Sequence, residues 1–477
     1  MGRTFASLRH FNYRTWFFTA LIANIGTWMQ IVAQDWLVLA ELTEDDAFAV
    51  GFVSALQFAP LLFITPFAGL LADRCDKRRI LFVTQSCLAL LALGLGVLVL
   101  SGGAQVWQVC LFAVGTGTVA AFDGPPRMVF VSELVPSEDL PNAVGLNSTG
   151  FNLARLIGPA VAGTLISAVG TGWVFVVNGL SFVFTIGALL AIRTGELYVR
   201  QVDPEDLRGR GRVREGLRYV ASRGDLTVIF LVLGTVACLT LNFQLTSAAM
   251  ARTVFDKNAG EYGILGSVFA VGSVTGALMA ARRRTTPRTR TVVVAAGLCG
   301  VTSGVSAVMP TYATFAVSLM FVGFTQLLLF TSANTVVQVS TEPTVRGRVM
   351  SLYQTVIMGT SPIGSIVVGW IAEVASPRWG IGMGSIVAFA MVAWAYLWGR
   401  RHWGRDGTLQ HSLPAARPDR RPRRAGTGDL AVPPGRSRRA PGVPVGADRP
   451  GPGADAPVSM KSSMPSGCGE TSGVRRW

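Results

Sequence analysis

Residues 80–122 read ILFVTQSCLALLALGLGVLVLSGGAQVWQVCLFAVGTGTVAAF, a run without a single charged side chain. A helix that crosses the hydrocarbon core of a bilayer needs about 20 mostly apolar residues. The run is therefore long enough for two such helices, and Ser101, Gly102 and Gly103 supply the turn between them. This stretch predicts a pair of membrane helices joined by a tight turn.

Uncharged runs of the same kind fill most of the chain up to Gly399. Residues 140–192, whose only charge is Arg155, and residues 291–341 are each long enough for two more helices. Single helices fit residues 15–34, 47–72, 226–251, 262–281, 349–372 and 379–399. The sequence therefore predicts an all-α integral membrane protein with twelve transmembrane helices.

The composition of the 477 residues excludes an ordinary cytosolic protein. Hydrophobic residues make up 50% and charged residues 14% of the chain, with a mean hydropathy of +0.45, whereas soluble domains carry about 25% charge. With both termini inside, 38 of the 42 lysines and arginines lie in inner segments and only 3 in outer loops. Because this bias orients membrane proteins, we expect a multi-pass protein of the cytoplasmic membrane with both termini cytoplasmic and an uncleaved first span.

A charged segment divides the chain into two halves. Residues 193–224 form the only long internal connection and separate six predicted helices from six. We predict an N-terminal half at 1–192, a cytoplasmic loop at 193–224 and a C-terminal half at 225–400. The basic remainder, 401–477, is rich in Pro, Gly, Ala and Arg and is predicted to be disordered. This tail either rests on anionic inner-leaflet lipids or is solvated without a function.

The two halves show a weak internal repeat. Gly158 and Gly163 in the fifth predicted helix recur as Gly364 and Gly369 in the eleventh, both 206 residues later. Parallel six-helix halves are a known transporter architecture. We therefore expect the halves to be related by a pseudo-twofold axis along the membrane normal.

Residues 69–79, GLLADRCDKRR, resemble the signature between the second and third helices of the major facilitator superfamily. Asp76 departs from that signature, which usually has glycine there. The resemblance implies a gating loop and an acidic residue of the fourth helix that pairs with the basic cluster at Lys77–Arg79. The gating residues would be Gly69, Asp73, Arg74, Lys77, Arg78, Arg79 and Asp123.

The fifth predicted helix contains Gly158, Pro159 and Gly163 in the order Gly-Pro-x-x-x-Gly, which resembles the antiporter motif of drug exporters in that superfamily. The alternative is that glycine and proline are simply common in membrane helices. Three further stretches, at 123–127, 134–143 and 346–348, resemble the branch that contains enterobactin exporters and macrolide efflux proteins. The resemblance covers roughly residues 5–400 and says nothing of the substrate.

Two ionisable residues of the spans have alternative interpretations. Arg155 must face protein or water, because a charge at the bilayer centre costs at least about 2.5–3.5 kcal/mol. Its candidate partners are Asp123 and Asp35, and it belongs either to a gating latch or to a ligand contact. Asp35 is either an interfacial carboxylate near the external mouth or a group that couples transport to protons.

Neutral polar side chains mark candidate cavity-lining positions. In the first span they recur at spacings of three and four residues and so share one helix face, which lines either a cavity or a helix interface. The candidates are Asn24, Thr27, Gln30, Gln34, Asn242, Gln244, Gln326, Asn334 and Gln338. Some of them would instead be contacts between helices.

Several classes of function have no support in the sequence. His10, His402 and His411 lie outside the spans, the six cysteines are unpaired in spacing, and no phosphate-binding Gly-x-x-x-x-Gly-Lys motif is present. We expect no enzyme, no cofactor, no metal, no nucleic-acid binding and no ATP.

These observations predict a secondary transporter that exports a small amphipathic compound, such as a drug, an antibiotic or a siderophore-like metabolite, in exchange for protons. Its partners would be that substrate, protons and the lipid bilayer. Alternatives are a carrier on the same fold that moves lipids or takes up a metabolite, and a receptor or scaffold that does not transport.

Overall fold

The computed structural model describes residues 3–198, 212–282, 287–342 and 345–402, which belong to one compact unit extending from Met1 to Ser412. All regular elements in these ranges are helical. The predicted tail lies outside the described residues beyond His402.

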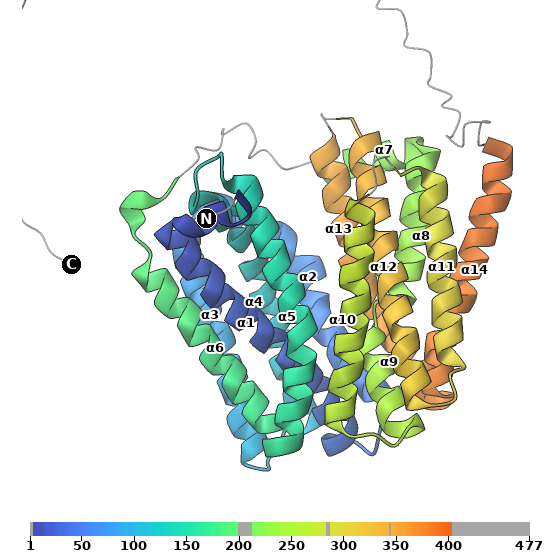
Figure 1. Cartoon of the computed structure of the whole chain (residues 1–477), viewed down its shortest axis with the longest axis horizontal. Helices are drawn as coiled ribbons and strands as arrows, with labels where there is room; N and C mark the ends of the chain where they lie inside the picture. The colour runs from blue at the N-terminus through green and yellow to red at the C-terminus, as the bar shows by residue number, and fades with distance from the viewer. Residues whose placement is uncertain (1–2, 199–211, 283–286, 343–344, 403–477) are drawn as a thin grey trace, which may run out of the picture. The chain divides into compact units, whose positions relative to one another are not determined.

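Six spans form an N-terminal bundle and six form a C-terminal bundle. The N-terminal bundle comprises α1 (Phe11–Trp36), α2 (Ala47–Arg74), α3 (Lys77–Leu100), α4 (Val106–Glu133), α5 (Leu140–Val169) and α6 (Thr171–Ala191). The C-terminal bundle comprises α8 (Gly224–Thr240), α9 (Phe243–Ala249), α10 (Ala259–Ala281), α11 (Thr289–Ala307), α12 (Tyr312–Ser340), α13 (Arg346–Val374) and α14 (Pro377–His402). Figure 1 shows the two bundles side by side, the first from blue to green and the second from green to orange.

The structure confirms the predicted fold class. Twelve helical segments in the described part of the chain are long and apolar enough to cross a bilayer. The first span is longer than its uncharged run, because the helix continues past Asp35 into a π-helical turn, η2 (Leu37–Leu42). The seventh span is interrupted at Leu241 and ends in a second π-helical turn, η5 (Met250–Val254).

The predicted loop at 193–224 contains a helix that the sequence analysis missed. Helix α7 (Arg212–Ser222) lies against α8 and α13, and Glu215 forms an ion pair with Arg348 at 2.5 Å. Residues 199–211 lie outside the described part of the chain. The end of the bundles that carries α7, the N-terminal segment and the α2–α3 turn is called the basic end here (Figure 1), and the other is called the opposite end.

Polar side chains fix where several helices begin. Asp46 accepts a hydrogen bond from Ala49 N at 2.9 Å and so caps α2, and Asp76 caps α3 in the same way. Asn258 and Glu261 form a reciprocal capping box at the start of α10. These caps satisfy backbone donors that the first helical turn leaves free.

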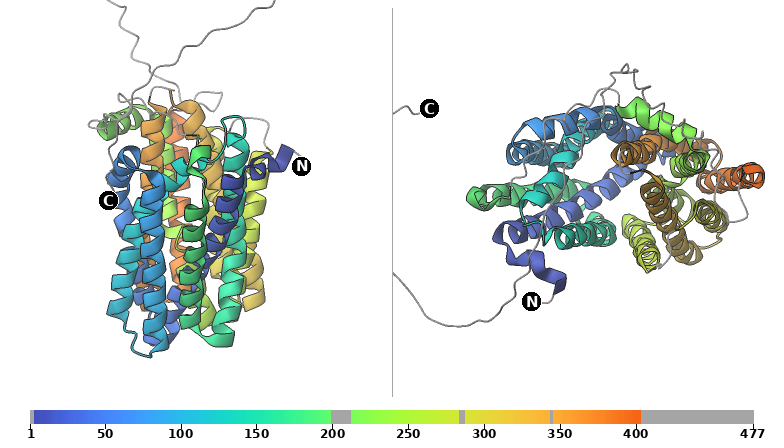
Figure 2. Two further views of the ribbon diagram at one scale, coloured as in Figure 1. Left: turned by 90° about the vertical axis from the view of Figure 1, so that its left-hand side faces the viewer. Right: turned by 90° about the horizontal axis from the view of Figure 1, so that it is seen from above.

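The hydrophobic core is shared between the bundles only in part. A cluster at the opposite end joins residues of both, among them Val32 and Leu39 with Leu245 and Tyr262. Towards the basic end each bundle has its own cluster, one around Tyr13, Trp16 and Phe130 and the other around Leu226, Val349 and Tyr353. Figure 2 shows the bundles as two groups of helices when seen from above. The bundles therefore pack against each other at the opposite end.

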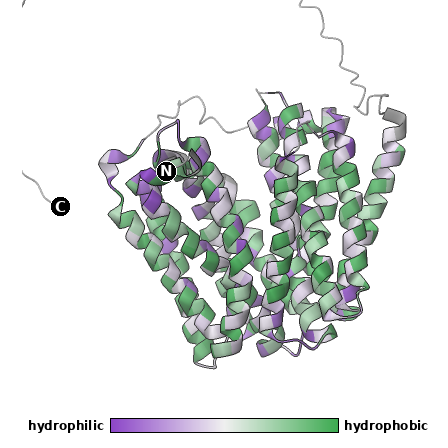
Figure 3. Cartoon of the chain, in the orientation of Figure 1, coloured by the Kyte–Doolittle hydropathy of each residue, from purple (hydrophilic) through white to green (hydrophobic). Residues whose placement is uncertain are grey.

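The outward surface of the helices is apolar. Phe67, Leu90 and Leu190 are more than 60% exposed, and Figure 3 shows hydrophobic residues along the outer faces, with hydrophilic residues gathered near the helix ends. Lipid tails can cover such a surface, and the helices satisfy their backbone hydrogen bonds internally.

Candidate functional site

The predicted gating loop ties α3 to other helices of its own bundle. Lys77 Nζ lies 3.0 Å from Glu133 Oε1 at the end of α4, and Arg78 Nε donates to Leu189 O of α6 at 2.6 Å. Asp76, at φ −63°, accepts from Arg78 N at 2.9 Å. This backbone conformation is open to any residue, so the turn does not need the glycine that the family usually has there.

The expected pairing of Asp123 with the basic cluster is wrong in this conformation. Asp123 instead accepts hydrogen bonds from Arg127 Nε at 2.8 Å, Thr84 Oγ1 at 2.7 Å and Gln85 Nε2 at 2.8 Å. Asp123 lies ten residues before Glu133, which is about 15 Å along the axis of α4 at 1.5 Å per residue. Glu133 is the acidic residue of the fourth span that pairs with Lys77, and its place at the end of that span could have signalled this.

Gly69 makes no close helix contact in this conformation. A Cβ atom added there would meet no described atom within 4 Å. By contrast Gly276, which lies 207 residues later on α10, packs against the backbone of Phe324. Asp73 and Arg74 form the last turn of α2, and their side chains lie outside the described part of the chain. The gating assignment of Gly69, Asp73 and Arg74 remains a prediction.

The motif helix α5 forms a seam with α10 of the other bundle. A Cβ atom on Gly163 would lie 2.5 Å from Ala259 O and 3.0 Å from Gly263 Cα, and one on Gly266 would lie 2.7 Å from Pro159 Cβ. Only residues without large side chains allow backbones to approach so closely. The seam between α5 and α10 therefore depends on the glycines.

A second seam joins α2 to α13 in the same manner. A Cβ atom on Gly369 would lie 2.9 Å from Ala47 O and 3.3 Å from Gly51 Cα. Gly369 is the predicted repeat of Gly163, and the two glycines thus occupy matching places in the two seams. The other repeat pair matches too, because Gly158 packs against the first span at Trp28 and Gly364 packs against the seventh at Cys238.

Charged residues join the two bundles at the opposite end, beside the seams. Arg252 Nε lies 2.9 Å from Asp45 Oδ1, and Glu373 Oε2 accepts a hydrogen bond from Ala47 N at 2.8 Å. Both contacts join the N-terminal bundle to the C-terminal one. A polar hollow of about 310 Å³ lies beside them, lined by residues that include Asp45, Thr253 and Glu373. The sequence did not predict these two contacts, because the paired residues are more than 200 positions apart in the chain.

Arg155 pairs with neither of its two candidate partners. Its guanidinium lies over the Trp28 ring at 5.5 Å and over the Phe269 ring at 5.3 Å. Among the described residues, Asp123 is bound by Arg127, and Asp35 receives a hydrogen bond from Tyr262. The sequence did not predict these aromatic neighbours, because Phe269 belongs to the other bundle and lies far away in the chain.

Asp35 is buried where α1, α2 and α10 meet. Its side chain is 4% exposed, Tyr262 Oη donates to its Oδ2 atom at 3.3 Å, and Ser54 is a second hydrogen-bond partner. The Trp36 ring stacks on the Tyr262 ring at 6.1 Å. The carboxyl group is therefore not at a solvated mouth, and hydroxyl groups supplied by both bundles surround it.

Three of the predicted cavity residues instead join helices. Gln30 Oε1 accepts from Asn178 Nδ2 at 2.5 Å, and Gln34 Nε2 donates to Gln57 Oε1 at 2.8 Å. Gln326 Nε2 donates to Thr240 O at 2.8 Å. All three glutamines are less than 7% exposed, so the cavity prediction is wrong for them here. An amide in a bilayer needs a partner, and the neighbouring helix supplies it.

The remaining polar candidates differ among themselves. Asn242 is buried at the break in the seventh span and donates to Cys238 O at 2.7 Å. Thr27 is exposed and bonds its own backbone at Ala23 O, and Asn334 accepts from Gln338 on the same helix. Asn24 and Gln244 are half-buried. Asn24, Thr27, Gln244 and Asn334 stay candidates for a substrate path.

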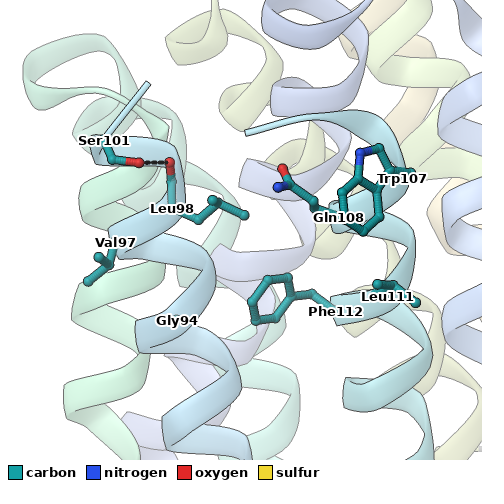
Figure 4. A pocket seen from close by; sticks show the side chains of 8 residues that line it. All are labelled: Gly94, Val97, Leu98, Ser101, Trp107, Gln108, Leu111 and Phe112. Atoms are coloured by element: carbon teal, nitrogen blue, oxygen red, sulfur yellow. Dashed lines mark hydrogen bonds between the residues drawn. The ribbon is translucent and has the colours of Figure 1, made fainter. Parts of the chain in front are cut away.

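A groove on the N-terminal bundle lies away from these contacts. It has a volume of about 450 Å³ between α3 and α4 and is lined by Gly94, Val97, Leu98, Ser101, Trp107, Gln108, Leu111 and Phe112. Figure 4 shows the two helices facing each other across it. Val97, Trp107 and Leu111 are each about 60% exposed, so the groove opens on the apolar outer surface and not between the bundles.

Comparison with known proteins identifies the class to which this architecture belongs. The chain is 27% identical over 369 residues to the multidrug efflux pump Tap of Mycolicibacterium fortuitum, covering 75% of this chain and 88% of that protein. It is 22% identical to the macrolide efflux protein A of Streptococcus pyogenes, covering 76% and 90%. The fold matches the inward-facing, unoccupied crystal structure of a bacterial homolog to the human lysosomal transporter Spinster, with a TM-score of 0.64, 16% identity and 82% and 97% coverage.

The protein is thus a multi-pass membrane transporter of the major facilitator type and not an enzyme. Residues 2–414 match the transmembrane secretion effector family, and the chain belongs to that family. The predicted superfamily is confirmed. The predicted function, efflux of small compounds, agrees with the relatives, whereas proton coupling and the site residues stay predictions.

Proposed function

We propose that the protein exports small amphipathic compounds across the cytoplasmic membrane, in exchange for protons, by alternating access between its two bundles. In this proposal the basic end and both termini face the cytoplasm, in accordance with the asymmetric distribution of lysine and arginine. The observation that carries the proposal is the uneven contact between the bundles. They meet through two glycine seams and a charged closure at the opposite end. At the basic end the Lys77–Glu133 pair lies within the N-terminal bundle, and the Arg348–Glu215 pair joins α13 to the connecting helix α7.

This distribution of contacts suits a rocking motion. Each bundle has its own hydrophobic cluster near the basic end and can move as a unit. The seams are made of backbone and small residues, which meet without interlocking side chains. Breaking the Asp45–Arg252 pair and the Glu373–Ala47 hydrogen bond would open the opposite end. The present conformation then corresponds to the state open to the cytoplasm.

The relatives support export as the direction. The multidrug efflux pump Tap and the macrolide efflux protein A are both named as efflux proteins, and each aligns with about three quarters of this chain. A third relative, the staphyloferrin A transporter of Staphylococcus aureus, is 23% identical over 264 residues. Drugs, antibiotics and siderophore-like metabolites are therefore the compound classes to test.

Asp35 is the candidate group for proton coupling. Its described partners, Tyr262 and Ser54, are neutral hydroxyl groups, so the carboxyl group can gain or lose a proton without breaking an ion pair. One of these partners belongs to each bundle, which means that rocking would change the surroundings of Asp35. A carboxyl group of this kind can link proton exchange to the movement of the bundles.

The experiment that tests export is an accumulation assay in cells with and without the protein. The panel contains tetracycline, a macrolide and an iron-free siderophore, each assayed with and without a protonophore. We expect lower accumulation in expressing cells, and we expect the difference to vanish when the proton gradient collapses. Lowered accumulation that survives the protonophore would contradict proton coupling, and higher accumulation would reverse the direction.

The role of Asp35 is tested by Asp35→Asn in the same assay. We expect the variant to reach the membrane normally and to lose at least tenfold in gradient-driven efflux. The matched control is Glu44→Gln, which removes an exposed carboxylate just beyond the same span. Equal efflux by Asp35→Asn and the wild type would make Asp35 a structural residue.

A further inference from the structure

Arg155 lies at the middle of α5, where it contacts both bundles. The guanidinium carbon is 5.5 Å from the centre of the Trp28 ring on α1 and 5.3 Å from the centre of the Phe269 ring on α10. Close by, Ser267 of α10 donates a hydrogen bond to Leu156 O at 2.9 Å. The cation is therefore held between rings that belong to different bundles.

The hydrogen-bonding capacity of Arg155 is unused within the described part of the chain. A guanidinium carries five N–H donors in a planar fork, and aromatic faces satisfy only its charge. The two carboxylates that the sequence offered as partners bind other residues, Asp123 with Arg127 and Asp35 with Tyr262. A charge within a membrane span is costly unless it meets water, protein or a ligand. The N–H donors of Arg155 thus point to a partner that is not part of this chain.

Aromatic side chains continue on both sides of the arginine. The Phe269 ring stacks on the Phe243 ring, with centres 3.9 Å apart and planes at 11°. On the other side the Trp28 ring meets the Phe151 ring edge to face at 5.9 Å. The surroundings of Arg155 therefore combine one cation with flat apolar faces, which suits a molecule that has an anionic group and an aromatic body.

Arg155 and the rings of Trp28 and Phe269 lie at the level along α5 where the close packing against α10 ends. One turn further towards the opposite end, Gly158 and Pro159 are buried against Trp28 and Gly266. One turn towards the basic end, Phe151 is 47% exposed. A molecule that approaches between the bundles from the basic end would meet Arg155 just before the seam.

We propose that Arg155, with Trp28 and Phe269, binds the anionic group of an amphipathic substrate, namely a carboxylate, sulfonate or phosphate attached to an aromatic or otherwise apolar body. This inference rests on the proposed export function and narrows its substrate class to anions and zwitterions. The planar guanidinium fork binds such a group through paired hydrogen bonds. Trp28 and the 47% exposed Phe151 offer apolar surface to the body of the substrate. Phe269 is buried between Arg155 and Phe243, so it holds the guanidinium in place from the other bundle.

The test uses two rhodamine dyes with one xanthene skeleton, one with a free benzoate and the other with the same group as its ethyl ester. Transport of both dyes is measured in proteoliposomes of neutral lipid with the full-length wild type, Arg155→Gln, Arg155→Lys and the control Arg127→Gln. Arg127 is also an arginine close to a Trp ring, but its guanidinium is paired with Asp123. Binding of each dye to the purified proteins is followed separately by fluorescence anisotropy.

We expect the wild type to prefer the free acid by at least tenfold. Arg155→Gln should lose that preference and keep the rate for the ester, Arg155→Lys should keep part of it, and Arg127→Gln should keep the ratio of the two dyes. Equal handling of the two dyes by the wild type would overturn the proposal, as would equal loss of both in Arg155→Gln at normal membrane levels.

Anisotropy separates this proposal from the export proposal. Arg155-dependent binding of the free acid without transport of either dye would contradict export and support the anion site. Transport of both dyes without preference would support export and contradict the anion site. Added phosphatidylglycerol that abolishes Arg155-dependent dye binding would identify the site as one for a lipid headgroup and overturn its role in substrate recognition. If Arg155→Gln does not fold, the preference of the wild type and the Arg155→Lys variant decide the question.

Discussion

The Arg252 side chain reaches Asp45 across the boundary between the two bundles, with 2.9 Å between Nε and Oδ1. Asp45 holds this position with a left-handed backbone, at φ 65°, in the short connection between η2 and α2. Both side chains are more than a third exposed, and exposed ion pairs are worth about 0–1 kcal/mol. The pair is therefore too weak to lock the transporter, but it is strong enough to shift the balance between two conformations.

Removing this pair should open the opposite end more often. In Arg252→Gln or Asp45→Asn we expect a cysteine placed at Ala259, a buried seam position, to react about three- to fivefold faster with an impermeant maleimide added outside. That factor corresponds to slightly less than 1 kcal/mol, since 1.4 kcal/mol is tenfold. The measurement is the labelling rate in intact cells.

Two further variants control this experiment. Exchanging the charges, with Asp45→Arg and Arg252→Asp together, should restore slow labelling. Lys257→Gln breaks an ion pair with Glu261 that lies at the same end but within one bundle, so it should leave the rate unchanged. If Lys257→Gln speeds the labelling as much as Arg252→Gln does, the effect is one of surface charge and not of the closure.

The α5–α10 seam should tolerate no side chain at Gly163. A Cβ atom there already meets Ala259 O at 2.5 Å and Gly263 Cα at 3.0 Å, so Gly163→Val forces the two helices apart and prevents the opposite end from closing. We expect the rate of transport per molecule in the membrane to fall at least tenfold.

Gly187→Val is the matched control for this seam. Gly187 lies in α6 of the same bundle, and a Cβ atom there meets nothing within 4 Å. Both changes replace glycine by a better helix former and so alter helix propensity by a similar amount. Transport by Gly163→Val at the level of Gly187→Val would show that the seam does not need to close.

The Lys77–Glu133 pair should stabilise the basic end of the N-terminal bundle. Both side chains are mostly buried, at 16% and 9% exposure, so removing one partner leaves a charge without its counterpart. We expect Lys77→Gln or Glu133→Gln to lower the free energy of unfolding by about 1–3 kcal/mol. The check is the thermal unfolding midpoint of the purified protein in detergent.

The double variant and a neighbouring residue sharpen this measurement. Lys77→Gln combined with Glu133→Gln should cost less than the sum of the single changes, because the two groups interact. Arg79→Gln should change the free energy of unfolding by no more than about 0.5 kcal/mol. The Arg79 side chain is 89% exposed, and the change removes only its ion pair with Asp76, in which Nε and Oδ2 are 3.7 Å apart. Strict additivity of Lys77→Gln and Glu133→Gln would contradict a direct pair.

Hydropathy and charge were sufficient to predict the twelve spans, because a bilayer imposes length and apolarity on each helix separately. The repeat of Gly158 and Gly163 in Gly364 and Gly369 was also informative, and the structure gives these pairs matching contacts. The partners of individual side chains were not predictable in the same way. They depend on which helices are neighbours and at what depth, and neither quantity is visible along one chain.

Gln34 and Arg155 illustrate this limit. The periodicity of the polar residues in the first span predicted one face that lines a cavity or a helix interface, but Gln34 bonds Gln57 of α2 and Gln30 bonds Asn178 of α6. Arg155 was expected to meet a carboxylate, whereas its neighbours are aromatic rings on α1 and α10. A hydrophobic ring in a membrane span carries no signal that distinguishes a contact with lipid from a contact with a cation.

The orientation in the membrane decides whether the basic end, which we propose to be the open one, receives compounds from the cytoplasm. Cys75 provides a direct measurement of that orientation. Cys75 ends α2 at the basic end and is exposed. In a Cys468→Ser background we expect an impermeant maleimide to label Cys75 in inverted membrane vesicles and not in intact cells. Ser101→Cys introduces a thiol at an exposed position at the other end of α3. With Cys75→Ser added to the same background, this variant should show the reverse pattern. Labelling of Cys75 in intact cells would place the basic end outside, and the same contacts between the bundles would then describe a transporter open to the exterior.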